Sequence, residues 1–170
     1  MSSKPHVTAP EHIAAHHDPA GFDCGEPALN DWLRLQALKN EASGASRTYV
    51  VCAAGRIVGY YALATGAIAR AAATGKVRRQ MPDPIPVMIV GRLAVDTGYQ
   101  GHGLGYGLLR DALLRTLQAA EHAGIRAVLQ HAMTADAKRF YERAGFVESP
   151  LDPMMMMITI ADVEKALATP

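Results

Sequence analysis

The stretch GRLAVDTGYQGHGLGYGLLRDALLRTL, residues 91–117, decides the fold because it changes character twice within a short length. It begins as an apolar run that ends at Val95, passes through a polar corner, and then places a glycine at every second position across residues 101–107. Apolar residues recur at helical spacing over residues 104–120, which predicts an amphipathic helix packed against a sheet. The order is therefore strand, glycine loop and helix.

A helix that begins inside a glycine loop is suited to bind an anion, most often a phosphate. Its first turn carries backbone N–H groups without partners at the positive end of the helix dipole, and glycines let a ligand approach closely. A P-loop is excluded, because Gly105 is followed by Tyr106 and Gly107 instead of Lys and Ser or Thr. A dinucleotide fingerprint starting at Gly101 is disfavoured, because the acid at the right distance, Glu121, lies on the same helix.

Length and composition indicate one domain of ordinary size. The chain has 170 residues, 49% of them hydrophobic, which is enough to bury a core without disulfides or metals. Residues 1–20 form a polar leader with a possible edge strand at residues 6–8. We expect residues 21–170 to fold as a single domain.

The use of cysteine and histidine argues against a disulfide framework or a metal centre. Cys24 and Cys52 lie in unlike contexts, which fits a reducing compartment. His16 and His17, with His12 nearby, are more typical of a solvated surface than of a metal site, so we predict no metal. The first residues lack the apolar core of a signal peptide, and no apolar run approaches membrane-helix length. We therefore expect a cytoplasmic protein without membrane contact.

Charge is unevenly distributed, although the formal net charge is only +1 at pH 7. No acidic residue lies between Glu41 and Asp83, whereas the basic residues of this interval are Arg47, Arg56, Arg70, Lys76, Arg78 and Arg79. A basic stretch in a nearly neutral protein predicts contact with a polyanion, either coenzyme A or nucleic acid. For any single residue, a solvated loop explains the charge equally well.

The rest of the chain predicts further strands and helices around the central segment. Pro27 in a first turn opens a helix over residues 27–40, and the alanine-rich, basic residues 66–81 favour a short helix or a mobile loop. A strand, a crossover helix and a second strand imply parallel neighbours. We expect strands at 47–52, 57–63, 87–95, 125–131, 146–148 and 154–160, and later helices at 135–143 and 162–167.

A second motif, downstream of the glycine loop, indicates which kind of protein the loop belongs to. The run QGHGLG, residues 100–105, resembles the Q/R-x-x-G-x-G/A signature of the GNAT acetyltransferases, and AKRFYERAGF, residues 137–146, resembles their A-x-x-F/L-Y-x-x-x-G-F signature. A simple turn between strand and helix explains the first motif alone, but not both in this order. The resemblance covers about residues 47–160. It implies an α/β GNAT fold, with a mixed, mostly antiparallel central sheet that contains a splayed parallel strand pair and is flanked by helices.

The resemblance implies acetyl-CoA as the co-substrate. The backbone of the strand end would bind the pantetheine arm, the loop would bind the diphosphate, and the Tyr141 phenol would protonate the leaving thiolate as general acid. We expect Phe140 in the core and Tyr141 to point elsewhere. Many members carry asparagine where Thr134 stands. The predicted cofactor-binding residues are Leu93, Ala94, Val95, Gln100, Gly101, His102, Gly103, Leu104, Gly105, Tyr106 and Thr134.

Neither motif contains a convincing general base, and this bears on the acceptor. A lysine amine, with a pKa of about 10.4, is almost wholly protonated at neutral pH and would need a base, whereas an α-amine, at about 7.7–8.0, largely would not need one. The pKa of an α-amine on an aminoacyl ester should be lower still. The missing base therefore favours an α-amine acceptor.

Longer runs are similar to the toxin branch of the GNAT family, whose members acetylate the α-amine of charged tRNA and stop translation. They are FDCGEPALNDWL (22–33), SGASRTYVVC (43–52), GYYALATG (59–66), MPDPIPVMIVGRLAVD (81–96) and FVESPLDPMMMMITIAD (146–162). This likeness implies aminoacyl-tRNA as substrate, a homodimer, a ribbon-helix-helix antitoxin, and operator DNA contact only through the antitoxin complex. Our candidates for contacts to RNA phosphates are Arg34, Lys39, Arg47, Arg78, Arg79 and Arg92.

Two other functions are compatible with these motifs. The same chemistry could acetylate a small amine or a protein N-terminus, and only tRNA binding should weaken steeply with salt. A catalytically inactive CoA- or RNA-binding module is the second alternative, and Tyr141 beside a complete glycine loop argues against it. Spacing does not indicate which aminoacyl-tRNA is chosen, because loops assemble the acceptor pocket.

Overall fold

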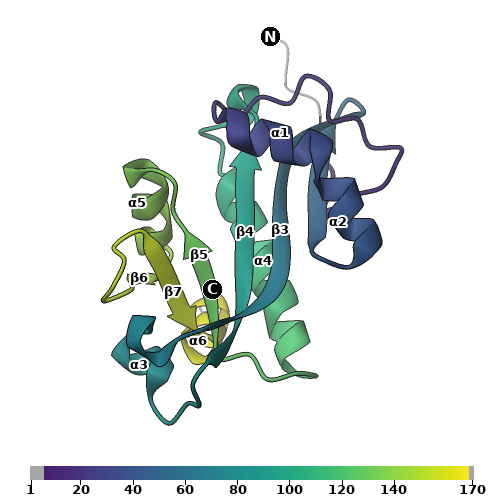
Figure 1. Cartoon of the computed structure of the whole chain (residues 1–170). Helices are drawn as coiled ribbons and strands as arrows, with labels where there is room; N and C mark the ends of the chain where they lie inside the picture. The colour runs from purple at the N-terminus through teal and green to yellow at the C-terminus, as the bar shows by residue number, and fades with distance from the viewer. Residues whose placement is uncertain (1–5, 169–170) are drawn as a thin grey trace. The chain divides into compact units, whose positions relative to one another are not determined.

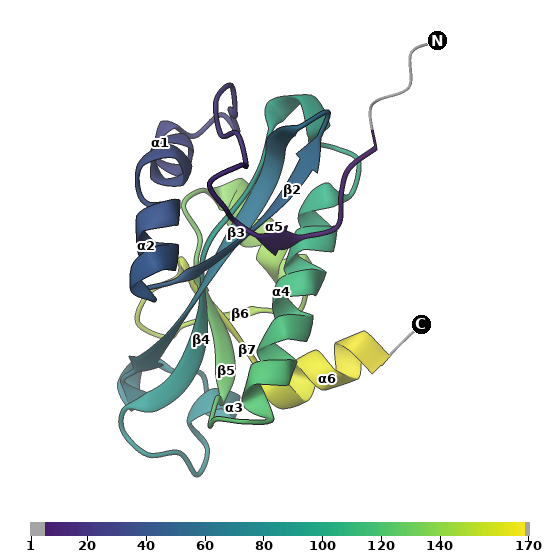
Figure 2. The same cartoon turned by 90° about the vertical axis from the view of Figure 1, so that its right-hand side faces the viewer.

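The structure, a computed structural model, describes residues 6–168 (Figures 1 and 2). Its strands are β1 (Glu11–His12), β2 (Arg47–Ala53), β3 (Arg56–Ile68), β4 (Ile85–Val95), β5 (Ala127–His131), β6 (Val147–Glu148) and β7 (Met155–Thr159). Its α-helices are α1 (Pro27–Leu35), α2 (Ala37–Ser43), α3 (Gly75–Arg78), α4 (Leu104–Ala120), α5 (Ala135–Arg143) and α6 (Ile160–Ala168). Two 3₁₀ turns, η1 (Arg70–Ala72) and η2 (Thr97–Tyr99), complete the described elements.

The strands form a seven-stranded mixed sheet in the order β1-β2-β3-β4-β5-β7-β6, with β4 and β5 as its parallel pair. This confirms the predicted fold class. The chain divides into two compact units, Met1–Ala64 with Gly91–Ala112 (unit 1) and Thr65–Val90 with Leu113–Pro170 (unit 2). The prediction that residues 21–170 form one domain stays a prediction. Within residues 6–168, no helix is long and apolar enough to cross a membrane.

Unit 1 contains the predicted β2–β3 hairpin, closed by Ala54 and Gly55. Both residues have positive φ, 51° and 82°, as a two-residue hairpin turn of type I′ requires. The predicted edge strand at residues 6–8 is wrong in position, because β1 lies at Glu11–His12 and pairs with β2. Thr8 still donates its N–H to the Cys52 carbonyl at 2.8 Å, but Pro10 has no N–H with which to continue a ladder.

The core of unit 1 forms where α1 packs beside the β2–β3 hairpin. Leu33 is buried, and Trp32 stacks on the buried Tyr60 with ring centroids 5.9 Å apart. The Tyr60 hydroxyl donates to the Leu29 carbonyl at 2.7 Å. The predicted single helix over residues 27–40 is in fact α1 and α2, which meet at Gln36, where φ of −119° departs from the helical value.

Unit 2 contains the parallel pair. The β4–β5 ladder joins Val87–Ile89 to Ala127–Leu129, and β5 continues to His131 with β7 as its partner. The methionine run supplies β7, as the predicted strand at 154–160 implied, and its Met156 and Met157 are buried in the core. Helices α3, α5 and α6 each contact β7.

The segment between β3 and β4 differs from its prediction. β3 runs five residues past the predicted end at residue 63, to Ile68, and only then do η1 and α3 follow. The Arg126 guanidinium donates to the carbonyls of Lys76 at 2.8 Å and Val77 at 3.0 Å, so it stabilises α3 from its C-terminal end. Tertiary contacts, rather than local helix propensity, hold this segment in place.

Replacing Gly59 with alanine should destabilise unit 1. An added Cβ would lie 2.9 Å from Val51 Cγ2 and 3.1 Å from Leu108 Cδ1, so the free energy of unfolding should fall by about 1–3 kcal/mol. Gly107→Ala is the matched control, because nothing lies within 4 Å of its Cβ position and alanine favours α4 by up to about 1 kcal/mol. Denaturant unfolding measures both, and equal effects would contradict the packing argument.

Candidate active site

The corner between β4 and α4 lies in unit 1 and is accessible to solvent. Gly101 and Gly103 both have φ of +81°, and a Cβ at either would meet nothing within 4 Å. Glycine is therefore required here by backbone conformation rather than by crowding. The first intrahelical bond joins the Gly107 N–H to the Gly103 carbonyl at 3.1 Å, so the N–H groups of residues 104–106 have no acceptor within the helix. His102 and Tyr106 are exposed beside them.

The end of β4 presents backbone groups on two sides. The Asp96 N–H donates to the Val58 carbonyl of β3 at 2.9 Å. Because strand residues alternate, Ala94 also directs its N–H and carbonyl toward β3, and its carbonyl oxygen lies 3.5 Å from the Cβ position of Gly59. Leu93 and Val95 face the other way. Of the three residues predicted to contact pantetheine, Ala94 is the one whose backbone N–H and carbonyl face β3 instead of the ligand side.

Tyr141 lies in unit 2 on α5 and is only 2% exposed. Its ring packs against Phe140 and Phe146 with centroids 5.1 Å and 5.3 Å away. The expectation that Phe140 is core and Tyr141 points elsewhere is wrong, since Phe140 is only half-buried. Tyr141 shares its helix face with two alanines, Ala137 and Ala144, at spacings of four and three, and that face can approach the sheet.

Burial makes the Tyr141 phenol a weaker acid than an exposed tyrosine. Loss of solvation raises its pKa well above the ordinary value for tyrosine. The phenol therefore stays protonated at neutral pH, which is the state that a general acid needs. Thr134 caps the same helix, with its hydroxyl oxygen accepting from the Ala137 N–H at 3.0 Å, so its side chain already has a structural role.

The predicted RNA contacts separate into engaged and unengaged cations. Arg34 pairs with Asp31, Arg47 donates to the Glu41 carbonyl at 2.8 Å, and Arg92 lies 4.9 Å from the centre of the Trp32 ring. Within residues 6–168, the candidates whose side chains make no such contact are Lys39, Arg78 and Arg79. Their charges can therefore be neutralised by a ligand without breaking an existing interaction.

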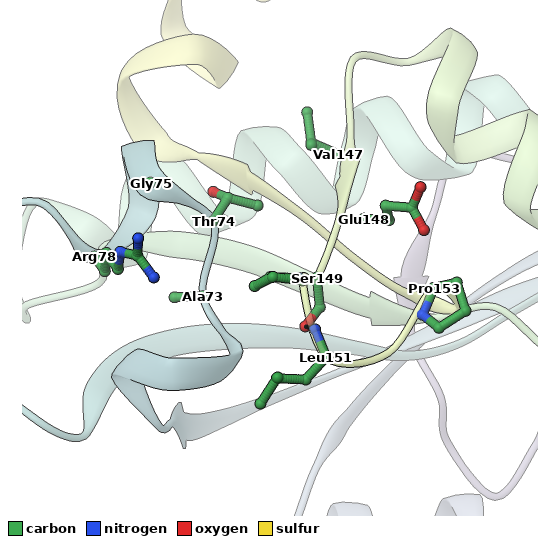
Figure 3. A pocket seen from close by; sticks show the side chains of 10 residues that line it. Ala73, Thr74, Gly75, Arg78, Val147, Glu148, Ser149, Leu151 and Pro153 are labelled. Atoms are coloured by element: carbon green, nitrogen blue, oxygen red, sulfur yellow. Dashed lines mark hydrogen bonds between the residues drawn. The ribbon is translucent and has the colours of Figure 1, made fainter.

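Arg78 also lines a pocket of about 560 Å³ in unit 2 that the sequence did not reveal (Figure 3). Figure 3 shows Arg78 at one end and Glu148 with Pro153 at the other. Exposed apolar side chains lie along it, with Leu151 68% exposed. The Ser149 hydroxyl donates to the Ala72 carbonyl at 2.6 Å and holds the wall. The only sequence signal is the SPLDP turn. The lining residues are Ala73, Thr74, Gly75, Arg78, Val147, Glu148, Ser149, Pro150, Leu151 and Pro153.

A cluster of Glu11, His16 and His17 brings possible metal ligands within 4.8 Å of one another. The Ala14 N–H donates to His17 Nδ1 at 2.8 Å, and His17 Nε2 lies 2.8 Å from the Glu11 carboxylate. In the neutral ring, the Nε2 atom therefore carries the proton and donates it to Glu11, so it is no metal ligand. This hydrogen bond lowers the pKa of Glu11. His17 is buried rather than solvated, contrary to expectation.

The order of strand β4, glycine corner and helix α4 is the one that the GNAT signature predicted. Residues 44–148 match the family described as the acetyltransferase (GNAT) domain, and the chain belongs to this family. It is 50% identical over 155 residues to a tRNA-acetylating toxin of Mycobacterium tuberculosis (strain ATCC 25618 / H37Rv), a match that covers 91% of this chain and 93% of that protein. The predicted likeness to the toxin branch is thereby confirmed.

Solved structures of similar proteins include two forms of the toxin AtaT. AtaT complexed with acetyl-methionyl-tRNAfMet superposes with a TM-score of 0.87 at 28% identity, covering 95% of this chain and 99% of AtaT. A tyrosine-to-phenylalanine mutant of AtaT bound to the C-terminus of the antitoxin AtaR and acetyl-CoA gives 0.83 at 27% identity, covering 96% and 99%.

Alkaline pH should destabilise the protein through the Tyr141 phenol. The unfolded chain loses this proton near pH 10, whereas burial keeps it on the folded chain to higher pH. The contribution of the Tyr141 phenol to the free energy of unfolding is thus fully present below about pH 10. It is lost as pH rises toward the folded-state pKa, by at most about 1.4 kcal/mol per pH unit. Unfolding measured at about pH 8 and about pH 11 should show a smaller loss in Tyr141→Phe than in wild type. Equal losses would contradict the burial.

Proposed function

We propose that this protein is a toxin that transfers the acetyl group of acetyl-CoA to the α-amine of aminoacyl-tRNA and so blocks translation. The observation that carries the proposal is the 50% identity to a tRNA-acetylating toxin over 91% of the chain. The AtaT complex with acetyl-methionyl-tRNAfMet supports the same acceptor chemistry in a protein of the same fold.

The β4–α4 corner fits acetyl-CoA. The N–H groups that open α4, from residues 104–106, suit the diphosphate, because the helix dipole and the glycine loop favour an anion there. The outward-facing backbone of Leu93 suits the amides of the pantetheine arm, which would add to β4 like a strand. Acetyl-CoA supplies the activated acyl group as a thioester. The predicted contacts of Gln100, Gly101, His102 and Thr134 belong to the same proposal.

The chain's own groups then serve a direct transfer. The acceptor nitrogen would attack the carbonyl carbon to form a tetrahedral intermediate, in which the Val95 N–H would stabilise the negative oxygen. The carbon–sulfur bond then breaks, and the nitrogen gives up one proton to the solvent. The Tyr141 phenol gives its proton to the departing sulfur. An α-amine on an ester has a much lower pKa than a lysine amine, so a larger fraction of it is unprotonated at neutral pH and the reaction needs no strong base.

We propose the same partners that the toxin branch uses. The complex of AtaT with the C-terminus of AtaR supports an antitoxin partner here, of the ribbon-helix-helix type, with operator DNA bound only through the toxin–antitoxin complex. A homodimer and a cytoplasmic location complete the proposal.

The decisive experiment incubates the protein with labelled acetyl-CoA and total charged tRNA, and then identifies the labelled product. Label on the amino acid of one or a few tRNAs supports the proposal. Label only on added amines or peptides indicates the other acetyltransferase function, and CoA binding without any transfer indicates an inactive binding module. Either of these outcomes would overturn the toxin assignment.

Replacing Tyr141 with phenylalanine should remove the acid and little else. Because the phenol is buried among aromatic rings, phenylalanine fills the same space. We expect kcat for tRNA acetylation to fall by about 100-fold or more, whereas the Kd for acetyl-CoA changes by less than about twofold. Single-turnover kinetics with calorimetric binding separates the two effects. Full activity in this variant would rule out the phenol as the proton donor.

Arg78 and Arg79 should contact RNA phosphate. Each replacement by alanine removes a cation that has no partner within the described residues, so tRNA binding should weaken and its log–log salt slope should fall by about one unit per arginine. Arg110→Ala, a change of the same charge on the exposed face of α4, is the matched control and should leave the slope near that of wild type. Filter binding across salt concentrations gives the slopes. Unchanged slopes in both variants would exclude the contact.

A further inference from the structure

The motif FDCG, residues 22–25, has no part in the chemistry above, yet it contacts the acetyl-CoA corner within unit 1. The Thr97 N–H donates to the Asp23 carbonyl at 2.8 Å, and the Asp23 N–H donates back to the Asp96 carboxylate at 3.1 Å. Asp96 is 5% exposed, and it also accepts the Gly98 N–H at 2.9 Å and lies 3.5 Å from the Arg56 guanidinium. Asp96 thus joins the start of the corner to a segment more than 70 residues away.

Gln100 makes a second tie at the other end of the same turn. Its side-chain NH₂ group has two hydrogens, and the nitrogen lies 2.8 Å from the Val95 carbonyl oxygen and 3.2 Å from the Cys24 carbonyl oxygen. With the Asp96 N–H bonded to Val58, the peptide between Val95 and Asp96 is held on both sides. The Gln100 side chain therefore binds the protein's own backbone.

The segment that receives these ties is itself rigid. The Asp23 carboxylate accepts the Gly25 N–H at 2.9 Å and the Asn30 side-chain amide at 3.0 Å, and the Asn30 side-chain oxygen accepts the Cys24 N–H at 2.9 Å. Asn30 lies on α1, which packs in the core of unit 1 through Leu33. The Cys24 carbonyl is thus a fixed point that is anchored to a helix.

A fixed point matters here because glycine makes the binding loop intrinsically mobile. Gly101 and Gly103 carry no side chains that contact a neighbour, so the loop has many accessible conformations. Only conformations that align the first amides of α4 bind a diphosphate. The apparent Kd equals the intrinsic Kd divided by the populated fraction of those conformations. Anchoring the turn that leads into the loop, at Asp96 and at Gln100, raises that fraction.

We propose that Gln100 is a positioning residue for acetyl-CoA. By joining the carbonyls of Val95 and Cys24, it holds the diphosphate-binding corner in its binding conformation, with Asp96 making the companion tie. This inference rests on the proposed acetyl-CoA site. It gives residues 23–25 the role of supporting that site. The Gln100 side chain acts through this support, and only the Gln100 backbone would contact the ligand.

The test is Gln100→Met, which keeps the length of the side chain and its neutrality but removes both donors. Free CoA serves as the probe in calorimetry, and acetyl-CoA in steady-state kinetics. We expect the Kd for CoA and the KM for acetyl-CoA to rise together by about tenfold, while kcat stays within about twofold. Gln100→Arg, which restores N–H donors, should recover much of the affinity. Asn30→Ala should raise the Kd in the same direction by loosening residues 23–25.

Glu11→Gln is the matched control, because it weakens the Glu11–His17 tie elsewhere in the N-terminal segment. It should lower the melting temperature without changing the Kd. If Gln100→Met lowers the melting temperature but keeps wild-type Kd and KM, Gln100 is merely structural and the inference is overturned. Wild-type protein that binds no CoA would instead overturn the proposed function, and this inference with it.

Discussion

The N–H groups at the start of α4, which have no acceptor within the helix, are the constraint on which the site depends. A helix always leaves its first amides without internal acceptors, and the glycines before α4 place no side chain over them. This makes the corner a good anion site, but glycine also gives its backbone many accessible conformations. The buried Asp96 carboxylate and the Gln100 amide reconcile the two properties, because they fix the backbone that leads into the glycines and bind none of the first amides of α4.

The features that the sequence predicted well depend on neighbours within a few residues. The bounds of α5 agree with the predicted 135–143, and the Thr134 cap forms as expected, because a cap needs only an oxygen three residues before its donor. The Ala54–Gly55 turn and the positive φ of Gly101 and Gly103 are equally local. The glycine corner could therefore be located and its ligand class predicted without knowledge of any tertiary contact.

The features that the sequence missed depend on residues far apart in the chain. The bond from Gln100 to Cys24 spans 76 residues, and that from Arg126 to Lys76 spans 50, so neither leaves a spacing pattern. β3 extends to Ile68 because its partners lie in β4, where Gly66 packs against Ile89. The burial of Tyr141 in place of Phe140 did not need a distant contact to be predicted. The alanines at 137 and 144 mark the face of Tyr141, and a helical projection of the motif would have identified it.

The basic residues between Arg70 and Arg79 differ in whether the fold already gives their side chains a partner. The run from Arg70 to Arg79 reads as a uniformly basic surface, yet Arg70 donates to the Met81 carbonyl, and Lys76 pairs with Asp162 at 3.0 Å. These cations are already neutralised or hydrogen-bonded, so a phosphate would have to displace an existing partner to bind them. Arg78 and Arg79 have no such competitor within the described residues. A phosphate gains their full attraction, and the basic surface that nucleic acid can use is therefore much narrower than the sequence suggests.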